Sequence, residues 1–131
     1  MGMTEKLTRI LYVEDEPDIQ MIAKLALETI ADFTVQECSS GDEALKHAPE
    51  FKPQLILLDV MMPGMDGPTT FQELRKIPQT AKTPIIFMTA KVQPEEIDQY
   101  KRMGAIAVIA KPFDPMRLAT EIEENWENHN G

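Results

Sequence analysis

Five short, mostly apolar runs alternate with longer segments in which apolar residues recur every three or four positions, and this alternation strongly constrains the fold. The runs have the length of β-strands and cover residues 10–13, 34–38, 55–58, 85–88 and 107–110. The segments between them predict helices over about 17–30, from 41 onwards, over 68–76, over 94–103 and from 115 to about 126. Because strands and helices alternate, we expect an α/β fold, a doubly wound three-layer sandwich of five parallel strands and five helices.

The size and charge of the chain disfavour several classes of protein. Its 131 residues suit a single domain, and 43% hydrophobic with 27% charged residues is typical of a globular protein with its own core. The net charge of −9 disfavours direct binding to nucleic acid or to an anionic membrane. No apolar run approaches the ~20 residues of a membrane helix. The lone cysteine, Cys38, fits a reducing compartment, so we expect a cytoplasmic protein.

Four polar residues come at the ends of predicted strands. Asp15, Asp59, Thr89 and Lys111 close the first, third, fourth and fifth strands or follow them closely. In doubly wound folds the carboxyl ends of the strands form the functional edge of the sheet. The sequence therefore predicts that acids, a hydroxyl and an amine meet at one rim.

The acids at this rim need a positive partner. Glu14, Asp15 and Glu16 are consecutive, and Asp59 would stand beside them, so the carboxylates repel by roughly 4 kcal/mol per close pair. A proton, the ammonium of Lys111 or a divalent cation could offset this repulsion. With no histidine or cysteine nearby, hard oxygen ligands favour Mg²⁺ or Mn²⁺. Given such a cation, Asp59 could attack a phosphoryl group and form an acyl phosphate, while Glu16 could simply face solvent.

These residues resemble the receiver domain of two-component response regulators, and within that family a single-domain chemotaxis regulator. Five stretches carry the resemblance, in order along the chain: Ile10–Pro17 (ILYVEDEP), Asp59–Gly67 (DVMMPGMDG), Met88–Lys91 (MTAK), Gly104-Ala105 and Lys111–Phe113 (KPF). The resemblance covers about residues 8–126. It implies a flavodoxin-like sheet with the strand order 2-1-3-4-5.

The resemblance also implies a role for each residue of the rim. Asp59 would be the phosphoacceptor, Thr89 the switch hydroxyl and Lys111 the lysine that binds the phosphoryl group. The ligands of Mg²⁺ or Mn²⁺ would be Glu14, Asp15, Asp59 and the backbone carbonyl of Met61. The Lys111-Pro112 peptide bond would be cis, as proline permits.

As a phosphoprotein of phosphorelay signal transduction, such a chain would be a switch rather than an enzyme, at most phosphorylating and dephosphorylating itself. The phosphoryl group would come from a phosphohistidine of a sensor histidine kinase or a histidine phosphotransfer protein. A downstream protein would then read the face formed by the helix over 94–103, the strand over 107–110 and the last helix. We expect residues 1–131 to form a single receiver domain, with a core over about 8–127 and short flexible termini.

Two positions depart from the family pattern. Glu14 stands where Asp is commoner, and its extra methylene would shift the cation or its waters slightly. Val108 stands three residues before Lys111, where the family usually carries Tyr, Phe or His. That aromatic normally couples the site to the output face, so Val108 puts the usual coupling in doubt. Two alternatives therefore stay open, a receiver-like scaffold with weakened switching and a receiver domain excised from a larger regulator.

Two other functions fit the sequence less well. An aspartate-nucleophile phosphatase of the haloacid dehalogenase type needs a second Asp two residues after the first, and Met61 occupies that position. A flavin- or nucleotide-binding module would want a Gly/Ser/Thr-rich loop after the first strand, where three acids stand instead.

Overall fold

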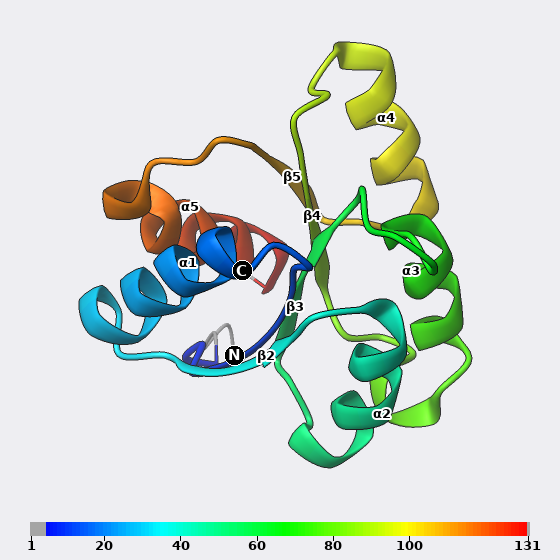
Figure 1. Cartoon of the computed structure of the whole chain (residues 1–131), viewed down its shortest axis with the longest axis horizontal. Helices are drawn as coiled ribbons and strands as arrows, with labels where there is room; N and C mark the ends of the chain where they lie inside the picture. Colours follow the sequence, from blue (N-terminus) through cyan, green and yellow to red (C-terminus); the bar gives the residue numbers. More distant parts are fainter. Residues whose placement is uncertain (1–4, 131) are drawn as a thin grey trace.

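A five-stranded parallel sheet lies at the centre of the molecule (Figure 1). The structure is a computed structural model and describes residues 5–130. The strands, in chain order, are β1 Arg9–Val13, β2 Thr34–Cys38, β3 Leu55–Asp59, β4 Ile85–Thr89 and β5 Ala107–Ala110. Across the sheet they lie in the order β2-β1-β3-β4-β5. The predicted fold class and strand order are both confirmed.

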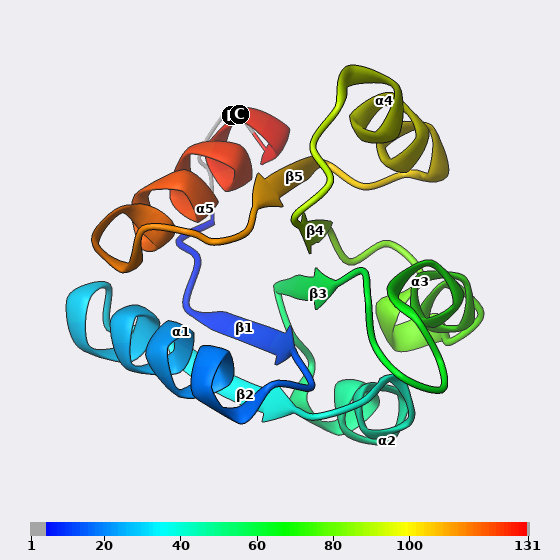
Figure 2. The same ribbon diagram turned by 45° about the horizontal axis from the view of Figure 1, so that its top comes forward.

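The helices form the two outer layers of the sandwich. In the described part of the chain they are α1 Pro17–Ile30, α2 Gly41–Phe51, α3 Gly67–Arg75, α4 Pro94–Met103 and α5 Pro115–Asn130. Figure 2 shows α1 and α5 on one face of the sheet and α2, α3 and α4 on the other. A short 3₁₀ helix, Pro78–Thr80, precedes β4 and was not predicted. Among residues 5–130, no helix combines the length and the apolar character needed to cross a membrane.

Alternate residues of each strand point into the two layers, and this sorts the side chains that follow each strand. Tyr12 belongs to the core on the side of α1 and α5, and Val13 to the core on the side of α2 and α3. The central strands β3 and β4 are buried along their whole length, as their apolar runs predict. By the same alternation Glu14 continues the face of Tyr12, whereas Asp15 continues the face of Val13.

At both ends of the described chain, residues outside the predicted core of about 8–127 are part of the folded structure. Leu7 is buried, and the indole N–H of Trp126 donates to the carbonyl oxygen of Glu5 at 2.8 Å. Helix α5 continues to Asn130, because Ile122 and Trp126 bury one face of it while its acids stay on the other. The predicted flexible termini fall partly on residues 1–4 and 131, which lie outside the described residues.

Candidate functional site

The first strand brings two acids to the carboxyl edge of the sheet. The Glu14 N–H donates to the carbonyl oxygen of Cys38 at 3.0 Å, so pairing with β2 continues one residue past β1. The side chain of Glu14 is completely buried, whereas Asp15 is half-buried. Glu16 is exposed, and α1 begins directly after it. The two acids that the sequence assigns to the cation therefore face inward, and the third faces solvent.

Asp59 is the last residue of β3, the middle strand, and is 2% exposed. Beyond it the chain turns back, and the Gly67 N–H donates to the carbonyl oxygen of Val60 at 2.8 Å. A Cβ atom on residue 67 would lie 2.4 Å from the carbonyl oxygen of Asp59, so only glycine fits there. The start of α3 is fixed by Asp66, whose Oδ1 accepts from the Thr69 N–H at 2.9 Å. The returning chain therefore packs directly against the backbone of Asp59 and Val60.

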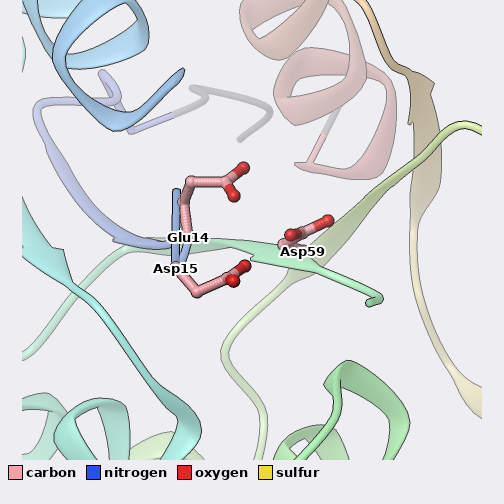
Figure 3. A group of neighbouring side chains, drawn as sticks. All are labelled: Glu14, Asp15 and Asp59. Carbon is pink, nitrogen blue, oxygen red and sulfur yellow. The ribbon is translucent and has the colours of Figure 1, made fainter. Parts of the chain in front are cut away.

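Three carboxylates converge at this edge (Figure 3). Glu14, Asp15 and Asp59 each place one carboxylate oxygen so that all three oxygens lie within 4.8 Å of one another. At that spacing two full negative charges repel by several kcal/mol at an effective dielectric of about 20. The structure brings together the acids that the sequence places at this rim, and their mutual repulsion favours a positive partner.

Lys111 supplies part of that charge from the end of β5. Its Nζ donates to Oε1 of Glu14 at 3.0 Å and to Oδ1 of Asp59 at 3.1 Å. Its backbone N–H donates to the carbonyl oxygen of Thr89 at 2.9 Å, which ties the lysine to the end of β4. The Lys111-Pro112 peptide bond is cis, as expected. A single ammonium therefore serves two buried carboxylates.

The pKa values of this cluster reflect the shortage of positive charge. Burial and the charge of Glu14 raise the pKa of Asp59 to about 7, although Lys111 opposes the shift. Burial alone would lower the pKa of Lys111, but its hydrogen bond to Glu14 and the charge of Asp59 outweigh burial and raise it. One lysine therefore does not fully neutralise the acids.

The donor set fits a hard divalent cation. All three side chains offer carboxylate oxygens, which Mg²⁺ and Mn²⁺ prefer, and the residual negative charge favours a cation over a neutral ligand. The acidic cluster is therefore consistent with the metal site of a receiver domain. The backbone carbonyl of Met61, in the loop after β3, stays a predicted ligand.

Thr89 ends β4 and is 2% exposed. In the register of the sheet Asp59 pairs with Met88, so Thr89 lies one residue beyond the partner of Asp59. The Thr89 Oγ1 accepts from the Lys91 N–H at 3.1 Å. Its hydroxyl proton stays available for an acceptor at the rim.

Comparison with known proteins identifies the family to which this arrangement of acids and lysine belongs. The family model of the response regulator receiver domain matches residues 10–123. The chain belongs to this family. A crystal structure of the chemotaxis response regulator CheY4 of Vibrio cholerae superposes on the receiver domain with a TM-score of 0.84 and 29% identity, covering 92% of this chain and 99% of that one. The resemblance drawn from the motifs is confirmed.

Longer regulators also contain this receiver domain. The probable C4-dicarboxylate response regulator DctR of Bacillus subtilis is 34% identical over 123 residues, which is 93% of this chain and 54% of DctR. The transcriptional regulatory protein ResD of the same organism is 36% identical over 116 residues, 88% of this chain and 47% of ResD. The chain thus spans about half the length of these curated relatives.

Val108, the departure from the receiver pattern, is half-buried on β5 and, like Tyr100 and Met103 of α4, packs against the core on that side of the sheet. The ring of Tyr100 lies over Phe87 of β4 with the two centroids 4.9 Å apart. None of the ten residues of α4 is fully buried. The helix therefore rests on the sheet through few large side chains.

One buried side chain near the site was missed by the sequence analysis. Tyr12 is fully buried, and its hydroxyl has no hydrogen-bond partner among the described residues. Burial and the negative charges of Glu14 and Asp59 raise the pKa of this phenol far above its ordinary value. In the sequence Tyr12 counts only as one more apolar position of the first strand, so nothing singled out its hydroxyl.

Proposed function

We propose that the chain is a phosphoacceptor receiver in which Asp59 takes a phosphoryl group from a phosphohistidine. The observation that carries this proposal is the hydrogen bond of Lys111 Nζ to both Asp59 and Glu14, beside three converging carboxylates. Glu14, Asp15, Asp59 and the carbonyl of Met61 would hold Mg²⁺ or Mn²⁺. When bound, the cation supplies positive charge for the phosphoryl oxygens.

The chemistry asked of the protein is a single displacement. An oxygen of the Asp59 carboxylate attacks phosphorus, a P–O bond forms, and the P–N bond to the donor imidazole breaks with its electron pair left on nitrogen. The Lys111 ammonium then pairs with a phosphoryl oxygen, and the Thr89 hydroxyl donates to another. The carboxylate is the reactive form, so its raised pKa makes neutralisation of the neighbouring acids part of the reaction.

An exposed apolar surface next to the site suits the phosphodonor protein. A groove of about 370 Å³ runs between α1 and the start of α5, and its lining includes Ile22, Phe113 and Lys111 itself. On the same helices Leu25 is 64% and Met116 is 71% exposed. Because a donor histidine must reach Asp59, a sensor kinase or phosphotransfer protein has to cover this rim. We therefore assign the groove to the phosphohistidine-bearing protein.

The output of the switch is a changed protein contact on the face formed by α4, β5 and α5. A separate effector protein would read that face in a single receiver domain spanning residues 1–131, and direct contact with nucleic acid or membrane is not part of this proposal. In a larger regulator an attached output domain would read the same face. A scaffold with weakened switching is a second candidate, favoured by the single observation that Val108 replaces the usual aromatic.

Incubation with Mg²⁺ and a small phosphodonor such as acetyl phosphate tests the proposal. We expect one acid-stable, base-labile phosphoryl group per chain, none after chelation and none in Asp59→Asn. Asp98→Asn, which removes an exposed carboxylate of α4, is the matched control and should be labelled like the wild type. Labelling that persists in Asp59→Asn would place the acceptor elsewhere and refute the proposal.

A further inference from the structure

The hydroxyl of Tyr12 lies where a phenylalanine would satisfy the packing. The aromatic ring is completely buried, in a cluster that includes Leu27 of α1, Leu57 of β3 and Met88 of β4. These members of the cluster are apolar, and the hydroxyl makes no hydrogen bond of normal geometry with any residue that the structure describes. A buried polar group without a partner is unfavourable and rare, so its presence needs an explanation.

The nearest charged group explains why a hydroxyl is useful there. Glu14 directly follows β1 and continues its pairing with β2, two residues after Tyr12, so the two side chains lie on the same face of the sheet. Both are completely buried. The negative charge of Glu14 acts directly on the phenol, as does that of Asp59. The Tyr12 hydroxyl therefore lies in the core and within the electrostatic influence of both Glu14 and Asp59.

Glu14 has few donors for a fully buried carboxylate. Its Oε1 accepts from Lys111 Nζ at 3.0 Å, and its Oε2 accepts from the Glu16 N–H at 3.2 Å. The lysine is shared, because it also donates to Asp59 at 3.1 Å. When Lys111 turns to a phosphoryl oxygen, Glu14 loses one of these donors. The phenol of Tyr12 is on the same face, and a hydrogen bond to Glu14 is among the causes that raise its pKa.

We propose that Tyr12 is a positioning residue whose hydroxyl donates to the Glu14 carboxylate and holds it in the orientation that binds the cation. The cation-binding part of this inference rests on the proposed function, whereas the Tyr12–Glu14 hydrogen bond does not. A donor behind a ligating carboxylate fixes its orientation, and loss of such a donor weakens metal binding about tenfold or more. Glu14 is longer than the usual Asp, so it has an additional torsion to be fixed.

The first test needs no cation and compares melting temperatures. Tyr12→Phe should lower the melting temperature by a few degrees, since it removes a hydrogen bond to a buried charge. In the Glu14→Leu background, which has no acceptor at that position, the same change should leave the melting temperature unchanged or raise it. A rise on Tyr12→Phe in the otherwise native chain would mean that the hydroxyl is a bystander and would overturn the proposal.

The second test measures Mg²⁺ affinity by titration calorimetry. Tyr12→Phe should raise the dissociation constant of Mg²⁺ about tenfold. Tyr100→Phe, which removes the chain's other phenol hydroxyl on α4, should leave it unchanged. Unchanged affinity in Tyr12→Phe would overturn the positioning role even if the melting temperature falls. If the native chain bound no Mg²⁺, the proposed function and the positioning role would both fail, while the melting temperatures would still decide the hydrogen bond.

Discussion

The Nζ of Lys111 lies 3.1 Å from Oδ1 of Asp59, across 52 residues of sequence. The fold makes this contact by ending two strands of one parallel sheet at the same edge, and the same ammonium also reaches Glu14 at 3.0 Å. Asp59 is buried and shares the Lys111 ammonium with Glu14, so its pKa of about 7 lies near neutral pH. A pKa near neutral pH makes the site responsive to added positive charge.

Replacing Lys111 should change both the titration and the stability of the protein. Lys111→Met removes the charge and the hydrogen bond that lower the pKa of Asp59, so this pKa should rise above about 7. Leaving the two buried carboxylates unpaired should lower the free energy of unfolding by about 3–5 kcal/mol at pH 8, and by less at pH 6, where Asp59 is protonated. Carboxyl NMR titration and urea denaturation measure the two effects.

The control for the lysine is Lys91→Met, which removes an exposed ammonium two residues after β4. It should leave the pKa of Asp59 and the unfolding free energy within error. Equal losses in both variants would show that general surface charge, and not the contact at 3.1 Å, sets the properties of Asp59.

Asp59→Asn should stabilise the cation-free protein near neutral pH. The pKa of Asp59 is about 7 in the folded protein against an ordinary 3.8, so the folded state keeps a proton that the unfolded chain has lost. The stability from this group is therefore fully present below about pH 4 and is lost as the pH rises to about 7. We expect a gain of about 4 kcal/mol at pH 8 that shrinks towards zero near pH 4. Urea denaturation across this pH range measures the gain, with Asp98→Asn as the control. A gain that did not depend on pH would contradict the account.

Mg²⁺ should stabilise the folded protein through the acids that face inward. At a concentration ten times its dissociation constant, the cation should add about 1.4 kcal/mol to the unfolding free energy. Asp15→Asn should remove most of this gain, because it deletes one of three converging carboxylates. Glu16→Gln, at the next and exposed position, should keep it. Thermal denaturation with and without Mg²⁺ measures this gain in each variant. An equal gain in Asp15→Asn and Glu16→Gln would mean that the cation binds elsewhere.

Phosphorylation should change the environment of Asp59 more than that of α4 and α5. Val108 offers no aromatic ring to move, and Tyr100 already rests on Phe87. Amide NMR spectra of the native chain should therefore shift at the carboxyl edge and only slightly along these two helices. Val108→Tyr should enlarge the shifts along α4. Large shifts over both helices in the native chain would show that coupling does not need an aromatic at this position.

The convergence of the site was predictable because strand ends follow from pattern. Continuous apolar runs give the strands, and parallel strands must share a carboxyl edge, so Asp15, Asp59, Thr89 and Lys111 had to meet there. The sequence predicted that the Lys111 ammonium could offset the charge of the acids, but not which carboxylates it would contact. One lysine bridging Glu14 and Asp59 depends on side-chain torsions that no spacing encodes.

Other features lay beyond a pattern of apolar and polar residues. Tyr12 reads as apolar, so its hydroxyl beside a buried acid is invisible until the strand faces are known. The need for Gly67 appears only in the folded chain, where a Cβ atom on residue 67 would lie 2.4 Å from the carbonyl oxygen of Asp59. The acids near the end of α5 suggest a solvated tail, yet Trp126 anchors the helix to Glu5, 121 residues away. Each of these depends on a contact between distant segments.

The most direct measurement maps the phosphorylated residue itself. After reaction with Mg²⁺ and a phosphodonor, borohydride reduces an aspartyl phosphate in place to homoserine, which peptide mass spectrometry can locate. The account predicts homoserine at position 59 alone, and none when Mg²⁺ is chelated before the donor is added. Modification at position 15, at His47 or at His129, or modification of residue 59 that is indifferent to Mg²⁺, would contradict it.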